Sequence, residues 1–170
     1  MGVNPEKISL ERANLTHVDG ILKLAVANSP ERGGELTGAL PREAVVSTIQ
    51  MLPGVVALRA GQVAGFLLSW EKAFSTHPCV AAMLDAYSGS EDAYVYGPVC
   101  VDASIRGQGI AAGMFSELRK LIPGREGILF IKASNTSSIR AHINMGMRKT
   151  AEYTWDGRTF LVFAYTGTAV

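Results

Sequence analysis

One stretch decides how this chain folds: Val99-Cys100-Val101-Asp102-Ala103-Ser104-Ile105-Arg106-Gly107-Gln108-Gly109-Ile110-Ala111. An apolar strand ends at Val101, and two glycines that flank Gln108 precede a helix-forming run from Ala111 to Leu121. Glycine lets backbone N–H groups approach a ligand closely, and a helix start presents unpaired N–H donors and a positive dipole end. Because such a junction binds phosphate, residues 106–111 predict a site for a phosphate-bearing cofactor.

Composition limits the class of protein. The chain has 170 residues, of which 48% are hydrophobic and 18% charged, and this predicts one globular domain over residues 1–170. The net charge is +1, which offers no basic field for a nucleic acid partner. No apolar run is long enough to cross a bilayer, and Met1 to Lys7 lacks an apolar signal core. We therefore expect a cytoplasmic protein without a membrane partner, whose Cys79 and Cys100 are reduced thiols.

The first half of the chain predicts a strand, two helices and a hairpin. Thr16 is expected as the N-cap of the first helix, with Asp19 in the capping-box position. Pro41 suits the first position of the second helix. Residues 71–93 predict an irregular loop, of a length that is often functional. The expected elements are a strand at Ile8–Arg12, helices from Thr16 to Asn28 and from Pro41 to Leu52, and strands at Val55–Arg59 and Val63–Trp70 around Ala60-Gly61.

The second half predicts a strand–helix–strand unit followed by a helix and a hairpin. The strand–helix–strand order over residues 94–132 predicts one parallel pair with a right-handed crossover. The fold class is therefore α/β (α+β in some schemes), with helices on both faces of a twisted, mostly antiparallel mixed sheet. The expected elements are a strand at Tyr94–Val101, a helix at Ala111–Ile122, a strand at Gly127–Lys132, a helix at Asn135–Met145 closed by Gly146, and strands at Met147–Thr154 and Thr159–Tyr165 around Asp156-Gly157.

The order of elements and the glycine motif resemble the Gcn5-related N-acetyltransferases, the GNAT superfamily. The signature of that family is Gln/Arg-x-x-Gly-x-Gly/Ala at a strand–helix junction, and here it reads Arg106-Gly107-Gln108-Gly109-Ile110-Ala111. A strand precedes the motif, a helix follows it, and Asn135 opens the next helix. The resemblance runs from Ile8 to Tyr165 and implies a three-layer α/β/α fold, while residues 71–93 match nothing specific.

A dinucleotide-binding fold is the rival interpretation, because Gly107, Gly109 and Gly113 almost spell a Rossmann fingerprint. Five residues separate Val101 from Gly107, however, whereas the Rossmann turn follows its strand directly. The next strand also ends in Lys132 where an acidic ribose ligand is expected. A P-loop is excluded because the chain has no Gly-Lys-Ser/Thr.

The resemblance implies acetyl-CoA as the co-substrate. Its diphosphate is then expected on the backbone amides around the signature residues, Arg106, Gly107, Gln108, Gly109, Ile110 and Ala111. In the family, the strand equivalent to Val99–Val101 splays from its parallel neighbour and pairs with the pantetheine arm. A backbone N–H near Cys100 or Val101 then stabilises the charge that develops on the acyl oxygen.

The helix that begins at Asn135 carries a second cluster. Asn135, Ser138 and His142 lie at i, i+3 and i+7, which places them on one helical face. The resemblance implies that Asn135, and Ser138 on the same face, contact the cofactor. His142 stands where the family often has the tyrosine that protonates the departing thiolate. Histidine is able to act as this general acid, and the alternative is a packing or surface histidine.

The cysteines and nearby residues leave other chemistry open. Cys100 lies in a strand, where it is either the nucleophile of a covalent acyl-enzyme or an inert packing residue. His77 and Cys79 are two potential ligands, whereas a zinc site needs three or four, so no metal is expected.

The acceptor side of the site is less defined. An amine must lose a proton before it attacks, and Glu71 and Asp92 are candidate bases, with a solvated loop charge as the alternative for each. Tyr94 and Tyr96 share one face of their strand, so they either line the acceptor pocket or belong to the core. The acceptor half is also expected to use the Glu31–Gly38 loop and the segment 71–93.

These observations predict an acyltransferase that moves an acetyl group from acetyl-CoA to a primary amine by direct attack in a ternary complex. The acceptor is a small molecule or a peptide, and a homodimer is an option by analogy with the family. The alternative function is a non-catalytic acyl-CoA sensor or scaffold on the same fold. The sequence does not identify the acceptor amine.

Overall fold

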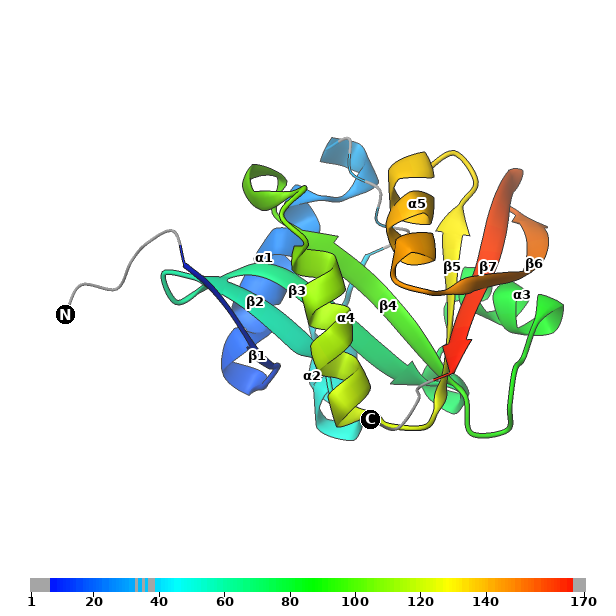
Figure 1. Ribbon diagram of the computed structural model, residues 1–170, viewed down its shortest axis with the longest axis horizontal. Coiled ribbons are helices and arrows are strands. Elements are labelled where there is room, and N and C mark those ends of the chain that lie inside the picture. The colour runs from blue at the N-terminus through cyan, green and yellow to red at the C-terminus, as the bar shows by residue number, and fades with distance from the viewer. Residues whose placement is uncertain (1–6, 33, 35, 37–38, 167–170) are drawn as a thin grey trace. The chain divides into compact units, whose positions relative to one another are not determined.

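The computed structural model describes residues 7–32, 34, 36 and 39–166, and within them it contains five α-helices and seven strands (Figure 1). In chain order they are β1 (Ile8–Arg12), α1 (Val18–Ala27), α2 (Arg42–Met51), β2 (Val55–Arg59), β3 (Gln62–Glu71), α3 (Pro78–Ala86), β4 (Tyr94–Val101), α4 (Ile110–Leu121), β5 (Glu126–Lys132), α5 (Thr136–Asn144), β6 (Arg148–Trp155) and β7 (Arg158–Thr166). Part of the expected acceptor loop Glu31–Gly38 lies outside the described residues.

The strands form a mixed sheet in the order β1-β2-β3-β4-β5-β7-β6. β4 and β5 run parallel, with Tyr94 opposite Gly127 and Val95 opposite Ile128. The pairs β1-β2, β2-β3, β5-β7 and β6-β7 are antiparallel. The predicted fold class, a mixed sheet with one parallel pair, is therefore confirmed.

The chain divides into two compact units. Unit 1 comprises residues 1–69 and 97–121, and unit 2 comprises residues 70–96 and 122–170. The strands β3 and β4 each contribute residues to both units. The expectation of a single domain over the whole chain stays a prediction.

In unit 1, helices cover two faces of the strands β1, β2 and β3 (Figure 1). The helix α1 packs on β3 where a Cβ on Gly20 would lie 2.7 Å from the Val63 side chain. The helix α4 contacts β1 and β2, and Met114 of α4 lies close to Gly65. Val63 and Gly65 face different helices although they are two residues apart, because a bulge shifts the register between Ala57 and Leu58.

In unit 2, alternate residues of the strands face different layers. One face holds the apolar core of Ala93, Val95, Ile128 and Val162, which packs around the fully buried Met83 of α3. The opposite face of β4 and β7 carries the tyrosines Tyr94, Tyr96 and Tyr165, and α5 supplies His142 to it. In unit 2, the face of the strands toward α3 is therefore apolar, and the face toward α5 carries aromatic side chains with polar groups.

The helix α3 corrects the expectation of an irregular segment 71–93. Pro78 occupies the first helical turn, and the His77 side chain accepts a hydrogen bond from the Cys79 N–H at 3.1 Å, which caps the helix. Cys79 and Met83 are buried, and burial of a methionine side chain stabilises a fold by about 2 kcal/mol. Packing against the sheet therefore makes a helix from a sequence whose periodicity is weak.

Two local expectations have different outcomes. Thr16 is not an N-cap, because the side chain of Asn14 accepts the Thr16 N–H at 2.9 Å and His17 Nδ1 accepts the Asn14 N–H at 3.1 Å. The two predicted hairpin turns are confirmed. Their central residues all have positive φ, with values of 51° and 77° at Ala60-Gly61 and 50° and 70° at Asp156-Gly157.

Candidate functional site

The glycine loop of unit 1 has the geometry of an open backbone turn. Gly107 and Gly109 have φ of 76° and 75°, and a Cβ placed on either would meet no atom within 4 Å apart from its neighbours in the chain. The first bond of α4 runs from the Gly113 N–H to the Gly109 carbonyl at 2.9 Å. The amides that precede this bond have no partner within the helix, so the turn is chemically able to bind an anionic group.

The side chain of Arg106 anchors this loop. Its Nε donates to the Val101 carbonyl at 3.1 Å, and its Nη2 donates to Asn28 Oδ1 at 2.6 Å. Asn28 closes α1, where its Nδ2 donates to the Leu24 carbonyl at 3.0 Å. The guanidinium of Arg106 therefore fixes the strand end to α1, and the predicted contact of Arg106 with a cofactor stays a prediction.

Asp102 supports the same turn, and the sequence analysis missed it. Its Oδ1 accepts from the Ser104 N–H at 2.9 Å and from Ser104 Oγ at 2.6 Å, and these bonds lower the pKa of the Asp102 carboxyl. The Asp102 N–H donates to the Ala64 carbonyl at 2.8 Å. The sequence does indicate this turn, through the spacing of Asp102 and Ser104, which is typical of an Asx turn.

The strand end before the loop is closely packed. Cys100 is buried, and burial raises the pKa of its thiol to about 11. A Cβ on Gly65 would lie 3.3 Å from the Cys100 carbonyl oxygen, so glycine at this position of β3 lets the backbone of β4 approach. Val99 and Val101 are half-buried. The oxyanion role of an amide here stays a prediction.

Asn135 of unit 2 serves as the N-cap of α5. Its Oδ1 accepts from the Ser138 N–H at 3.3 Å, and its own N–H donates to the Lys132 carbonyl at 2.8 Å. The predicted contacts of Asn135 and Ser138 with a cofactor stay predictions. Beside this cap, an open hollow of about 460 Å³ is lined by Lys132, Ala133, Ser134, Arg158 and Thr159.

His142 is almost fully buried, with 2% of its surface exposed. Its Nδ1 lies 2.7 Å from the Ser138 carbonyl oxygen, and its Nε2 lies 3.2 Å from the Tyr96 hydroxyl. Burial lowers the pKa of the imidazole below its ordinary value of 6.5, against an opposing effect of the Ser138 carbonyl. His142 is thus a neutral imidazole at pH 7.

Tyr94 and Tyr96 lie in one buried aromatic cluster with Tyr165, which the sequence analysis missed. The Tyr94 and Tyr165 hydroxyls are hydrogen-bonded to each other. The ring of Tyr96 meets the rings of Tyr165 and His142 edge to face, at centroid distances of 5.9 and 5.6 Å. A Cβ on Gly127 would lie 2.4 Å from the Tyr165 ring, so glycine makes room for that ring between the strands.

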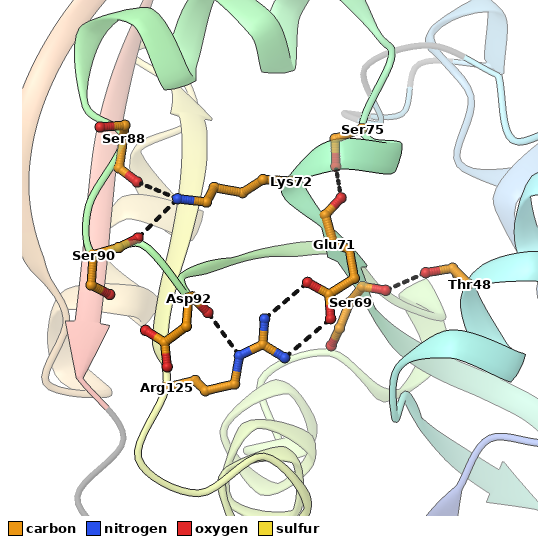
Figure 2. A network of polar contacts seen from close by, with 9 residues as sticks. All are labelled: Thr48, Ser69, Glu71, Lys72, Ser75, Ser88, Ser90, Asp92 and Arg125. Carbon is orange, nitrogen blue, oxygen red and sulfur yellow. Dashed lines mark hydrogen bonds and ion pairs between the residues drawn. The ribbon is translucent and has the colours of Figure 1, made fainter.

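Glu71 and Asp92 lie near each other around Arg125, as Figure 2 shows. Arg125 donates to both carboxylate oxygens of Glu71, at 3.2 and 2.9 Å, and its Nε donates to the Asp92 carbonyl at 2.8 Å. Lys72 donates to the carbonyls of Ser88 and Ser90 at 3.1 and 2.8 Å. Glu71 and Asp92 therefore belong to a network of hydrogen bonds that holds together the two ends of the segment between β3 and β4.

Neither a metal cluster nor a membrane-crossing helix occurs among residues 7–32, 34, 36 and 39–166. This part of the chain contains no group of three or more histidine, cysteine, aspartate or glutamate side chains that could hold a metal ion. Its helices include none with the length and apolar character that a membrane crossing requires.

Comparison with known proteins gives matches at the level of structure. No family model matches the sequence, and no curated protein does. The ribosomal-protein-S18-alanine N-acetyltransferase from Escherichia coli is 12% identical over 96% of this chain and 96% of its own, with a TM-score of 0.68. An N-acetyltransferase from Staphylococcus aureus is 19% identical over 95% of this chain and 99% of its own, with a TM-score of 0.66.

A third match carries the family name. It is a GNAT superfamily phosphinothricin acetyltransferase from Sinorhizobium meliloti, whose structure was solved in complex with acetyl-CoA. It is 17% identical over 95% of this chain and 89% of its own, with a TM-score of 0.68. The matches cover nearly all of this chain and agree in architecture. The chain therefore has the fold of the GNAT superfamily, the Gcn5-related N-acetyltransferases.

Proposed function

We propose that this chain is an N-acetyltransferase that moves an acetyl group from acetyl-CoA to a primary amine of a small molecule or peptide. The amine attacks the thioester directly in a ternary complex, without an acyl-enzyme. The single observation that carries the proposal is the open glycine turn at the β4–α4 junction of a GNAT fold. We also propose that the reaction takes place in the cytoplasm.

The glycine turn supports the co-substrate assignment. Gly107 and Gly109 hold positive φ and leave open space where side chains would otherwise stand. The N–H groups of residues 107–111 then donate hydrogen bonds to the diphosphate of acetyl-CoA at the positive end of α4. Arg106 and Asp102 fix the turn through bonds to Val101, Asn28 and Ser104, so the amides are oriented before the ligand arrives.

The buried thiol of Cys100 supports direct attack over a covalent route. A nucleophilic cysteine acts as its thiolate, and burial raises the pKa of Cys100 to about 11. The amine nitrogen is then the nucleophile, and an amide of Val99 to Val101 stabilises the charge on the carbonyl oxygen as the tetrahedral intermediate forms. The C–S bond breaks, coenzyme A leaves as the thiolate, and the proton that the acylated nitrogen loses neutralises this thiolate.

Calorimetry with matched glycine variants tests the co-substrate assignment. Gly109→Ala forces a side chain into a backbone conformation that disfavours it, and we expect affinity for coenzyme A to fall about tenfold. Gly61→Ala is the control, because Gly61 has a φ of 77° and equally open surroundings in the β2–β3 turn. Equal affinity for the two variants would refute the proposed position of the diphosphate.

A thiol-release assay with acetyl-CoA and a panel of amines tests turnover. Release of coenzyme A that depends on one class of amine is the expected result. Binding of acetyl-CoA without thiol release across the panel would instead identify a non-catalytic sensor on this fold.

A further inference from the structure

The open hollow of about 460 Å³ in unit 2 lies where the end of β5 meets the start of β7. These two strands lie side by side (Figure 1), and just beyond their last pair the Ala133 N–H donates to the Thr159 carbonyl at 2.9 Å. The Asn135 N–H donates to the Lys132 carbonyl at 2.8 Å, where the chain turns into α5. Backbone hydrogen bonds therefore hold the walls of the hollow, and its volume is within the range of small-molecule sites.

The side chains that line the hollow are mainly donors of hydrogen bonds. Lys132 ends β5 and Arg158 begins β7, so the two cations come from neighbouring strands. Ser134 and Thr159 add two hydroxyl groups, and the lining residues that the structure describes include no carboxylate. Lysine and arginine side chains donate and have no acceptor. Because a carboxylate or phosphate group accepts from both, the chemistry of the hollow favours an oxyanion.

The guanidinium of Arg158 is open to a ligand. Its side chain is exposed, and in the part of the chain that the structure describes no hydrogen bond or ion pair holds it. Asp156, two residues earlier in the β6–β7 turn, does not line the hollow. The guanidinium groups of Arg106 and Arg125, by contrast, are bound by Asn28 and by Glu71. Arg158 therefore differs from these two structural arginines.

Aromatic side chains lie beside the two cations on the same face of the sheet. In the strand register, Lys132 of β5 is opposite Phe160 of β7, which is itself opposite Tyr153 of β6. Trp155 is opposite Arg158. Residues directly opposite each other in antiparallel strands share one face. Phe160 is buried under the rings of its neighbours, at centroid distances of 5.3 Å and 6.3 Å, whereas Tyr153 and Trp155 are only half-buried. An anion held by both cations therefore has aromatic surface next to it.

We propose that this hollow is a binding site for a small organic oxyanion, that is, a carboxylate or phosphate group attached to an aromatic body. The guanidinium of Arg158 and the ammonium of Lys132 hold the anionic group, and the hydroxyls of Ser134 and Thr159 donate to its remaining oxygens. The aromatic body lies against Trp155. The site goes beyond the proposed acetyl transfer, because all of its residues belong to unit 2 and none belongs to the glycine turn of unit 1.

A titration of the protein followed by nitrogen-15 NMR locates the site. The probes are phenyl phosphate and benzoate, which carry the two oxyanions on the same ring, and benzylamine is the control of opposite charge. We expect saturable shifts of the amide signals of Ala133, Ser134 and Thr159 with at least one oxyanion, and none with benzylamine. Shifts confined to residues 106–111, or no shift at the hollow with either oxyanion, would overturn the proposal.

A matched pair of arginine variants tests the role of the guanidinium. Arg158→Gln removes one cation from the hollow, and we expect the oxyanion probe to bind about tenfold more weakly, the effect of one charge-assisted hydrogen bond. The control is Arg140→Gln, which removes an exposed arginine of α5 that does not line the hollow and should leave the affinity unchanged. Equal weakening in the two variants would show attraction to the overall charge of the protein and would refute a defined site.

Competition with coenzyme A identifies the source of the oxyanion, because coenzyme A carries phosphate groups of its own. We expect phenyl phosphate to shift the signals of Ala133, Ser134 and Thr159 equally with and without saturating coenzyme A, and Arg158→Gln to retain wild-type affinity for coenzyme A. Loss of these shifts in the presence of coenzyme A would assign the hollow to the coenzyme and overturn the proposal of a separate ligand. Probe shifts at the hollow of a protein that takes up no coenzyme A would refute the proposed function and support this site.

Discussion

Arg125 grips Glu71 through two parallel hydrogen bonds, Nη1 to Oε1 at 3.2 Å and Nη2 to Oε2 at 2.9 Å (Figure 2). The same guanidinium donates from Nε to the Asp92 carbonyl at 2.8 Å and lies over the ring of Tyr94 at 5.5 Å. One side chain just before β5 therefore joins the end of β3 to the segment that leads into β4 within unit 2. Planar bidentate pairing of this kind requires arginine.

Replacement of this arginine is expected to destabilise the protein. Arg125→Ala removes the pair, the carbonyl contact and the ring contact, and we expect the free energy of unfolding to fall by about 2 kcal/mol. Arg125→Lys keeps the charge but lacks the planar guanidinium that pairs with both oxygens of Glu71. Its free energy of unfolding should therefore fall by more than half as much as that of Arg125→Ala. Urea denaturation measures both. The control is Arg42→Ala, whose pair with Asp19 is exposed and should change stability by less than about 0.5 kcal/mol; equal losses at the two sites would contradict the assignment.

Glu126 is a buried carboxylate that fastens the chain after α3. It accepts from the Tyr87 hydroxyl at 2.8 Å and from the Ser90 N–H at 2.7 Å, and Arg148 lies 3.4 Å away. Glu126→Ala leaves these donors without their acceptor, so we expect a loss of about 2–3 kcal/mol in unfolding free energy. Hydrogen exchange over residues 87–93 should accelerate more than in β7. The exposed Glu152→Ala should leave this exchange unchanged, and unaltered exchange in Glu126→Ala would show that the carboxylate does not hold the segment.

Much of the fold could be predicted because local signals agreed with long-range packing. Both ends of the strand Tyr94–Val101 could be predicted, since its apolar run stops at a polar turn. The turns at Ala60-Gly61 and Asp156-Gly157 could be predicted from the glycine at the second central position, which adopts positive φ freely. The helix after Asn135 was also recognisable, because Asn135 caps it and Gly146, with φ of 93°, ends it.

The sequence could not show what depends on distant partners. The helix α3 is held by packing of Met83 on β4, β5 and β7, and a nine-residue segment carries little periodicity of its own. The pairing of Tyr96 with His142 spans 46 positions, and that of Glu71 with Arg125 spans 54. The tautomer of His142 depends on a carbonyl distance that only coordinates provide.

The thiol of Cys100 is expected to be unreactive in the folded protein. Because its pKa is about 11, only about one Cys100 side chain in a thousand is ionised to the thiolate at pH 8. Cys79 is also buried, and burial raises the pKa of its thiol. Iodoacetamide at pH 8 should therefore modify neither residue until urea unfolds the chain, as followed by mass spectrometry. Rapid alkylation of Cys100 in the native protein would reopen the covalent acyl-enzyme route.

Burial of neutral His142 should make stability fall on the acid side of neutrality. The pKa of the imidazole is 6.5 when exposed and lower in the folded state. Below pH 6.5 the unfolded chain therefore binds more protons at this residue than the native chain, and the free energy of unfolding decreases as the pH falls through the folded pKa. The His142→Gln replacement removes the titrating group, so the stability of this variant should depend less on pH between 6.5 and 5, as measured by urea midpoints at a series of pH values.

The control variant Tyr165→Phe lowers stability without removing the imidazole, and it should retain the wild-type dependence of stability on pH. Parallel slopes for wild type and His142→Gln would mean that His142 titrates alike in the folded and unfolded chains, which is incompatible with a buried neutral imidazole bonded to Tyr96.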